Sequence, residues 1–385
     1  MRERVYERLS RAQEAAAAGN YPKAFDALKS VEKMRNLEPY EKAQLYTSYG
    51  YIYFTQEKYT QSIDAYEKVL LQENLPAALR ATTVYTLAQL QFQGEDYAKA
   101  IDYLDAWLAT AQNPGPGPFV LQGQAYYQMG RYREAVVPVE KAIAIARERE
   151  ITIQENWYLL LRVFYFELEE YPKLVQVLDD LITRYPRKEY WIHLAAAYGE
   201  LGDERRQLAA YEVAHAGGHL DRGADLFALG QLLLQANVPY RAGVVLADGL
   251  ESGVIETTAE SYRLLSQAWM MAREDTRAIE ALTKAASLSG DGELDARLAQ
   301  AYANTGDWTK TIETCRSALQ KGVEDAHEIQ IMMGMAFFEL DRYEDAKDAF
   351  RSAEKSVDGR ATASQWIMFI EREEERLREL RRVLE

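Results

Sequence analysis

Few residues of this chain have the types and spacing that catalysis or metal binding needs. Only two of the four histidines, His215 and His219, stand four residues apart, a spacing at which two imidazoles on one helix could share a metal ion. Gly217 and Gly218 separate them, so we expect the segment HAGGHLDRG to be a turn. With Asp221 nearby, a weak metal site is one interpretation. A solvated loop is the other, and it is the one we favour.

The other reactive side chains are also better explained by structure than by chemistry. The chain has no G-x-x-x-x-G-K-[ST], strand-borne G-x-G-x-x-G, G-x-S-x-G or H-E-x-x-H motif. The carboxylate pairs Glu169–Glu170 and Glu373–Glu375 are expected on solvent-facing surfaces rather than as an acid/base pair. Cys315 is the one cysteine, which excludes an intramolecular disulfide, and we expect it to be a small core residue. The sequence therefore predicts no enzyme, no metal and no cofactor.

A repeated motif indicates the elements that position every other side chain. An aromatic residue shortly before a small residue recurs at intervals of 33 to 39 residues. A fixed period of this size is typical of a solenoid, in which each repeat buries its apolar face against its neighbours. The copies are GNYPKAF, EKYTQSI, EDYAKAI, GRYREAV, EEYPKLV, VPYRAGV, GDWTKTI and DRYEDAK, and GDERRQL and REDTRAI lack the aromatic residue.

Each repeat is expected to be a pair of helices. In residues 43–76, Tyr46, Tyr49, Gly50 and Tyr53 have helical spacing, and a second helix begins at Tyr59. Gly50 lowers helix propensity, which is explicable if another helix approaches closely there. The loop AQNPGPGP, residues 111–118, is expected to be a non-helical connector.

The pattern resembles the tetratricopeptide (TPR) repeat, W-x2-L-G-x2-Y followed by A-x3-F-x2-A and often P. The small-residue position is held by Ala24, Ser62, Ala100, Ala135, Ala278 and Ala346, whereas the sixth repeat has Gln207 and the seventh Gly243. The resemblance implies an all-α, right-handed superhelical α-solenoid of about ten helix-turn-helix repeats over residues 1–360, with a C-terminal capping helix at 361–385. The expected repeats are 5–38, 43–76, 81–114, 116–149, 155–188, 188–221, 224–257, 259–292, 292–325 and 327–360.

TPR arrays offer a concave surface formed mainly by the first helix of each repeat, and this suggests a peptide-binding groove in the N-terminal half. Four successive repeats place an aromatic residue at one equivalent position, and two place glutamine at another, which could bond a peptide backbone. The alternative is that these rings pack between adjacent repeats. The candidate partner-binding residues are Thr47, Tyr51, Phe54, Tyr85, Gln89, Phe92, Gln124, Tyr127 and Phe166.

Charge and hydropathy narrow the class of partner. The net charge of −15 argues against nucleic acid or anionic lipid as the main partner, because both would be repelled. No stretch approaches the ~20 apolar residues of a membrane span. The first residues, MRERVYERL, predict an amphipathic helix without the apolar region of a signal peptide. This fits a cytosolic protein, or a mature form whose leader was replaced by a start methionine.

Longer stretches resemble a bacterial group of TPR proteins encoded beside TonB–ExbB–ExbD energy-transduction genes in Gram-negative proteobacteria. The resemblance implies a periplasmic protein without its leader, an accessory role in TonB-dependent uptake, and TonB- or ExbD-type partners. The alternative is a cytosolic TPR adaptor for the assembly or regulation of a protein complex. The stretches are RVYERLSRAQE, GYIYFTQEKYTQSIDAYEKVL, VYTLAQLQFQGEDYAKAI, ENWYLLLRVFYFELEEYPK, YWIHLAAAYGELGDERRQLAAYE, VPYRAGVVLADGLESGVI, LSGDGELDARLAQAYANTGDW and QWIMFIERE.

Overall fold

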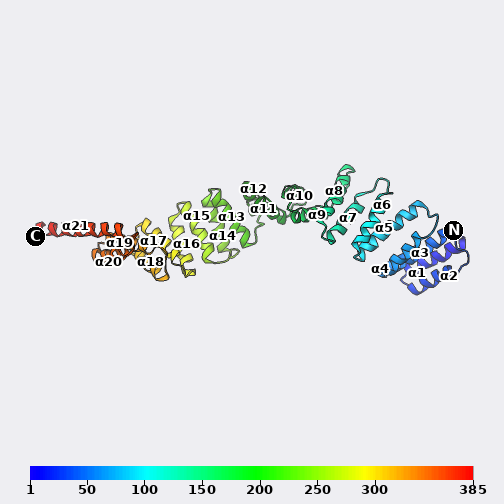
Figure 1. Cartoon of the computed structure of the whole chain (residues 1–385), viewed down its shortest axis with the longest axis horizontal. Coiled ribbons are helices and arrows are strands. Elements are labelled where there is room, and N and C mark those ends of the chain that lie inside the picture. The colour runs from blue at the N-terminus through cyan, green and yellow to red at the C-terminus, as the bar shows by residue number, and fades with distance from the viewer. Residues whose placement is uncertain (385) are drawn as a thin grey trace. The chain divides into compact units, whose positions relative to one another are not determined.

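The computed structural model describes residues 1–384, and all regular structure in them is helical (Figure 1). The helices form ten consecutive pairs followed by one longer helix, which confirms the expected all-α solenoid of about ten helix-turn-helix repeats. The chain divides into two compact units, unit 1 over residues 1–186 and unit 2 from residue 187 onward.

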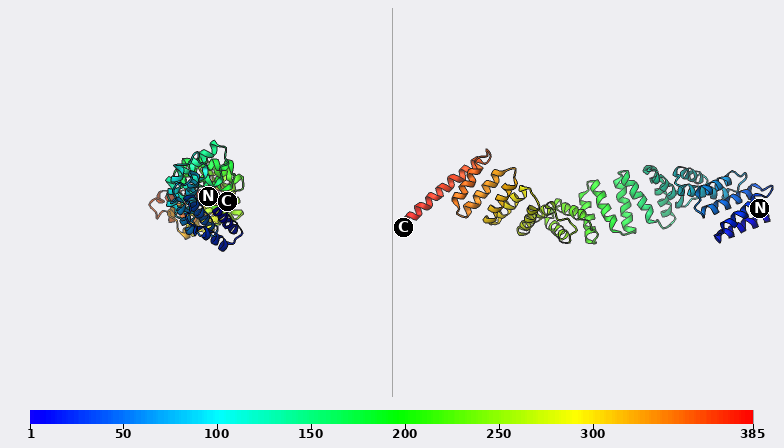
Figure 2. Two further views of the ribbon diagram at one scale, coloured as in Figure 1. Left: turned by 90° about the vertical axis from the view of Figure 1, so that its right-hand side faces the viewer. Right: turned by 90° about the horizontal axis from the view of Figure 1, so that it is seen from below.

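Unit 1 holds the first five helix pairs, which follow one another in sequence order (Figures 1 and 2). The helices are α1 (Glu3–Ala17), α2 (Tyr21–Glu32), α3 (Pro39–Phe54), α4 (Tyr59–Leu70), α5 (Ala77–Gln93), α6 (Tyr97–Leu108), α7 (Pro116–Gln128), α8 (Tyr132–Glu148), α9 (Glu155–Glu167) and α10 (Tyr171–Arg184).

Unit 2 holds the other five pairs and the final helix. The helices are α11 (Lys188–Glu200), α12 (Glu204–Ala216), α13 (Gly223–Gln235), α14 (Pro239–Glu251), α15 (Ala259–Met271), α16 (Asp275–Leu288), α17 (Gly292–Thr305), α18 (Trp308–Lys321), α19 (Ala326–Glu339), α20 (Tyr343–Ala353) and α21 (Arg360–Leu384).

The two helices of a pair approach each other most closely where the repeat has its small residues. A Cβ atom at Gly50 of α3 would lie 2.6 Å from Cε2 of Tyr66 on α4, so only glycine fits there. At the same crossing the hydroxyl of Ser62 donates a hydrogen bond of 2.8 Å to the carbonyl oxygen of Gly50. The close approach expected at Gly50 is confirmed, and it fixes how the second helix packs on the first.

Each turn between the two helices of a pair contains one residue with positive φ. Such a backbone costs an L-residue roughly 1–2 kcal/mol, and glycine adopts it freely. The ten residues are Gly19, Glu57, Glu95, Gly130, Glu169, Gly202, Asn237, Arg273, Gly306 and Asp341. The turn geometry is therefore conserved among the repeats of this chain although the residue type is not.

The structure corrects two expectations about loops. Residues 116–118 of the proline-glycine segment form the first turn of α7, which begins at Pro116. Proline fits there because N–H groups of the first helical turn have no acceptor within the helix. His215 and Ala216 belong to the last turn of α12, and Asp221 pairs with Lys188 at 2.6 Å. Within residues 1–384, no group of three or more His, Cys, Asp or Glu side chains is arranged to hold a metal ion.

Cys315 of α18 and the start of α21 are both part of the core of unit 2. Cys315 is fully buried, as expected, and burial raises the pKa of its thiol to about 12. The apolar start of α21 packs on α19 and α20 through Trp366 and Ile370, with the ring of Trp366 stacked on Phe350. No helix among the described residues is both long enough and apolar enough to cross a membrane.

Candidate partner-binding surfaces

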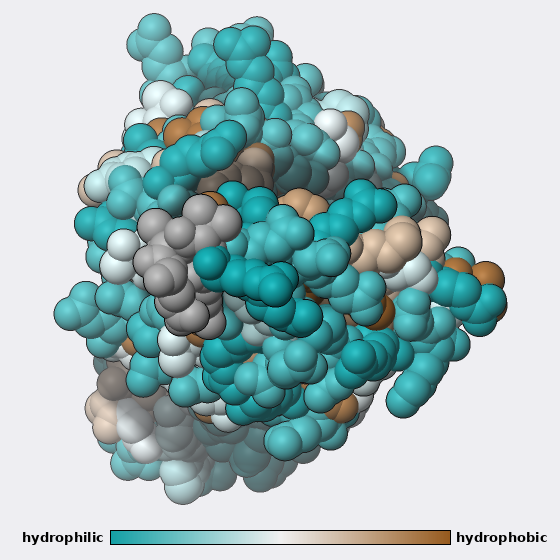
Figure 3. All heavy atoms as spheres, turned by 90° about the vertical axis from the view of Figure 1, so that its left-hand side faces the viewer, coloured by the Kyte–Doolittle hydropathy of each residue, from teal (hydrophilic) through white to brown (hydrophobic). Residues whose placement is uncertain are grey.

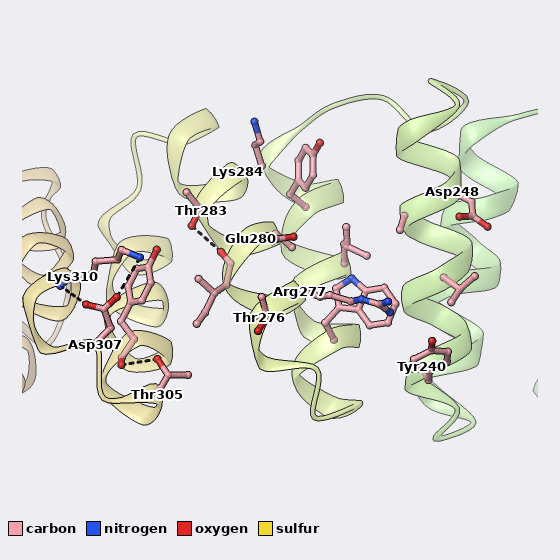
Figure 4. A pocket seen from close by; sticks show the side chains of 18 residues that line it. Tyr240, Asp248, Thr276, Arg277, Glu280, Thr283, Lys284, Thr305, Asp307 and Lys310 are labelled. Carbon is pink, nitrogen blue, oxygen red and sulfur yellow. Dashed lines mark hydrogen bonds and ion pairs between the residues drawn. The ribbon is translucent and has the colours of Figure 1, made fainter.

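A groove in unit 2 runs across the second helices of three successive repeats, α14, α16 and α18. We call it the unit 2 groove. It has a volume of about 1010 Å³, and first helices α15 and α17 form its floor (Figure 4). Its lining includes Tyr240, Val244, Ala247, Asp248, Tyr262, Leu265, Trp269, Thr276, Arg277, Glu280, Thr283, Lys284, Tyr302, Thr305, Asp307 and Lys310.

A glycine shapes the floor of this groove. A Cβ atom at Gly243 of α14 would lie 2.6 Å from Cζ3 of Trp269 on α15. The seventh repeat thus has glycine in place of the usual small residue because the eighth repeat has tryptophan where most others have tyrosine. The sixth repeat compensates in a similar way, since Gln207 lies against Gly199, where a Cβ atom would be 2.6 Å from its Nε2.

Aromatic rings and cations are layered at one end of the unit 2 groove. The rings of Tyr240 and Trp269 meet edge to face at 5.6 Å, and the guanidinium of Arg277 lies 4.8 Å from the centre of the Trp269 ring. A hydrogen bond with Tyr240 raises the pKa of Arg277, so this guanidinium stays charged. Tyr240 remains 52% exposed. A partner can therefore reach an aromatic surface beside a fixed positive charge.

Three polar side chains of the groove keep their hydrogen-bonding groups open to a ligand. Asp248, Glu280 and Lys284 form no ion pair or side-chain hydrogen bond within residues 1–384, and they stand on the facing helices α14 and α16 (Figure 4). Lys310, by contrast, pairs with Asp307 at 3.2 Å, and this hydrogen bond raises the pKa of Lys310. Carboxylates only accept hydrogen bonds and ammonium groups only donate them, so the open groups suit a ligand that has both donors and acceptors.

A second groove, of about 640 Å³, lies in unit 1 between α2 and α4 with α3 as its floor. Phe25 of α2 packs on Tyr53 at 5.1 Å, and Tyr49 lies beside both rings. Burial and the neighbouring carboxylate of Glu32 raise the pKa of Tyr49, whose hydroxyl lies 3.3 Å from Oε2 of that residue. Three lysines and three acidic side chains surround the rings, so this groove repeats the aromatic and charged character of the unit 2 groove.

The residues predicted from the sequence occupy a different face. All nine lie on the first helices α3, α5, α7 and α9 of unit 1. Tyr51, Phe54, Gln89 and Phe166 are exposed, and Thr47, Tyr85, Phe92, Gln124 and Tyr127 are half-buried. On α3 they alternate with Tyr46, Tyr49 and Tyr53, which face the second groove instead.

Ring contacts give several of these aromatic residues a structural role. Phe54 lies 6.3 Å from Tyr59, and Phe92 lies 5.3 Å from Tyr97, so each packs on the tyrosine that begins the second helix of its own repeat. Tyr127 also contacts the next repeat, at 5.7 Å from Phe164. These contacts orient the rings and still leave part of Phe54 open to a partner.

The sequence reasoning missed a recurring cation–π contact within the repeats. In four of them a basic residue follows the aromatic residue at the end of the first helix by eight positions and lies over its ring. The pairs are Lys173 over Tyr165 at 5.3 Å, Arg206 over Tyr198 at 5.8 Å, Arg277 over Trp269 at 4.8 Å and Lys310 over Tyr302 at 5.1 Å. The signal was readable as an aromatic residue and a basic residue at this spacing across each turn.

The repeated helix pairs, the buried small residues and the uniform turns define an α-solenoid of the tetratricopeptide-repeat class. The family described as "RNPP family C-terminal domain" matches residues 20–153, which contain α2 to α8. Three solved structures illustrate the likeness. MamA is 20% identical over 46% of this chain and 94% of its own, with a TM-score of 0.38. A tetratricopeptide repeat protein from Parabacteroides merdae is 19% identical over 69% of this chain and 99% of its own, with a TM-score of 0.41.

The third is YrrB, described as a TPR protein with an unusual peptide-binding site. It is 14% identical over 50% of this chain and 99% of its own, with a TM-score of 0.39. All three likenesses concern the fold.

Proposed function

We propose that this protein is a non-catalytic scaffold that binds a segment of a partner protein in the unit 2 groove. The observation that carries the proposal is the combination of an aromatic floor with the open polar groups of Asp248, Glu280 and Lys284. A polypeptide segment can place apolar side chains against the floor and bond its amide donors and acceptors to these groups.

The dimensions of the groove favour a polypeptide over a small molecule. Small-molecule pockets enclose ~300–1,000 Å³ and cover most of their ligand. The unit 2 groove reaches the top of that range, and residues from α14 to α18 line it, so its contacts are spread along several repeats. A ligand that uses them all must be long, as a stretch of protein chain is.

Site-specific photocrosslinking tests the groove. A photoreactive amino acid is introduced at Thr283, on α16 within the groove, and at Thr110, an exposed residue in unit 1, as the control. The proposal expects a partner protein to crosslink at Thr283 and not at Thr110, and the crosslink to weaken in a Tyr240→Ala variant. Equal crosslinking at both positions, or none at Thr283 while the partner still binds, would contradict it.

The row of nine residues in unit 1 remains a proposed second contact surface for the same partner. Its support is the exposure of Tyr51, Phe54 and Gln89 on successive first helices. Substituting Tyr51 and Gln89 together by alanine should weaken partner binding without unfolding the helices, because neither side chain is buried. Unchanged affinity in the folded double variant would remove this surface from the proposal.

We further propose a periplasmic accessory role beside a TonB system, with TonB or ExbD as candidate partners. Its support is the resemblance of long sequence stretches to TPR proteins encoded beside such systems. A crosslinking pull-down from a Gram-negative host, using a C-terminal tag on the chain with its native leader, tests both place and partner. Recovery of TonB, ExbD or an outer-membrane receptor would support the role. Recovery of cytosolic partners alone would favour the alternative, a cytosolic adaptor.

A further inference from the structure

The last helix, α21, reaches beyond the helices on which it packs. It is held as far as Glu374 by Trp366, Ile370 and a partly buried ion pair in which Nζ of Lys347 lies 3.0 Å from Oε2 of Glu374. The ion pairs of later residues, Arg376 with Glu373 and Arg378 with Glu374, stay within α21 itself. The described part of the helix beyond Glu374 thus has no ion pair to another element.

An apolar stripe begins at Phe369, whose ring also packs on Phe338 and Trp366, and continues into the free part of α21. Phe369, Leu377 and Leu380 are spaced by eight and three residues, which places them on one side of a helix. Phe369 is 49% exposed and Leu380 is 45% exposed, while Leu377 is half-buried. The capping helix of a solenoid is expected to present a polar outer face, so this stripe departs from what a cap alone requires.

The charges of the same segment are divided along the helix. Residues 371–375 contain four glutamates and one arginine, a net charge of −3, and residues 376–382 contain four arginines and one glutamate, a net charge of +3. If two copies pair antiparallel, the acidic segment of each copy lies opposite the basic segment of the other. A parallel pair would instead place like charges side by side.

We propose that α21 pairs antiparallel with α21 of a second copy of this chain to form a two-fold symmetric dimer. Such an interface uses the same patch twice, and the divided charge of α21 is complementary to itself in this arrangement alone. The apolar stripes of the two helices pack against each other, which buries the exposed surface of Phe369 and Leu380. Figure 3, viewed from the α21 end, shows a mostly hydrophilic surface with small separated hydrophobic patches.

Sedimentation equilibrium of the full chain over a range of concentrations tests the pairing. The expected result is a reversible monomer–dimer equilibrium that Leu380→Glu weakens at least about ten-fold, because the new carboxylates enter the apolar stripe. The matched control is Leu71→Glu, at an apolar residue of unit 1 that is 77% exposed, and it should leave the equilibrium unchanged. Circular dichroism confirms that both variants are folded.

A pair of charge reversals tests the electrostatic part. Arg378→Glu with Arg382→Glu makes the whole segment acidic, and Glu371→Arg with Glu375→Arg makes it basic. Each double variant alone should dimerise at least about ten-fold more weakly, and their mixture should recover a heterodimer. A monomer at every concentration, a dimer that Leu380→Glu leaves intact, a loss that Leu71→Glu reproduces, or a mixture that stays monomeric would each overturn the proposal.

Discussion

The carboxylate of Glu41 links the first repeat to the second, and its removal should loosen α1. Its side chain is 1% exposed. It accepts hydrogen bonds from the guanidinium of Arg2, at 2.6 Å from Nη2 and 3.0 Å from Nε, and from the backbone N–H groups of Arg2 and Glu38 at 2.8 and 3.1 Å. Glutamine at this position keeps the shape of the side chain and loses its charge.

The size of the effect follows from these contacts. Hydrogen bonds to a charged group contribute ~1.5–3 kcal/mol to stability. Because the side chain of Arg2 is about half exposed, solvent screens part of the attraction, and we take ~1.5–2 kcal/mol for Glu41→Gln. The equilibrium for local opening of α1 should therefore increase roughly 10- to 30-fold, at 1.4 kcal/mol per factor of ten.

The same carboxylate makes the first repeat sensitive to acid. The hydrogen bond from Arg2 lowers the pKa of Glu41 from 4.5 to about 2, although burial acts in the opposite direction. A group with a lowered folded-state pKa stabilises the protein fully above its unfolded pKa. That stabilisation is lost as the pH falls from about 4.5 towards 2. Wild-type α1 should lose protection in this window, and the Glu41→Gln protein should lack that contribution.

Amide hydrogen exchange resolved to single helices measures both effects, because it reports local opening where a global unfolding curve of two units would not. The matched control is Glu73→Gln, at an exposed residue of the same unit. Exchange in α1 should increase in the Glu41 variant alone, while α10 stays unchanged in both. Equal exchange of α1 in the two variants, or no loss of wild-type protection between pH 4.5 and 2, would refute this account of Glu41.

Three further outcomes are expected. Cys315, with its pKa raised to about 12 by burial, should resist alkylation at pH 8 in the native protein and react once the protein is unfolded; rapid native labelling would contradict its burial. Glu169→Gly should increase the free energy of unfolding by up to ~1 kcal/mol and so raise the thermal midpoint, because Glu169 has a φ of 56° that glycine adopts without strain. Gly292→Ala should cost ~1–3 kcal/mol, because its Cβ would lie 2.4 Å from the carbonyl oxygen of Gly322, whereas Gly290→Ala should change the midpoint little, with no atom within 4 Å.

The repeat architecture was predictable because the residues that build it recur. The period marks every helix pair, and Gly50 was expected at a close approach that the structure confirms at 2.6 Å from Tyr66. The first turn of α7 was missed because a proline is read as a helix breaker, although it also fits the start of a helix. Contacts that depend on departures from the repeat, such as Arg2 with Glu41, leave no periodic signal.

The candidate binding surface was harder to predict, and the reason is physical. A consensus records the side chains that pack inside a repeat, whereas a groove forms between second helices of neighbouring repeats and depends on pairs of residues from two different repeats. Gly243 and Trp269 illustrate this dependence, since the glycine of one repeat makes room for the tryptophan of the next. Neither residue indicates a groove by itself.

The cation–π contacts contribute both to packing within a repeat and to the groove between repeats. An aromatic residue followed eight positions later by a basic residue is a local pattern that stabilises a single repeat, by ~0.5–1 kcal/mol at an exposed site. In the eighth and ninth repeats, however, the same cations, Arg277 and Lys310, also line the unit 2 groove.

Arg277→Gln should therefore have two separable effects, a small loss of stability and a larger loss of partner affinity, because the guanidinium holds its ring contact while facing the groove. The equivalent change Arg206→Gln, over Tyr198 and outside the lining of that groove, should reduce stability by a similar amount and leave affinity unchanged. Loss of affinity in both variants would mean that the contacts act through the fold alone.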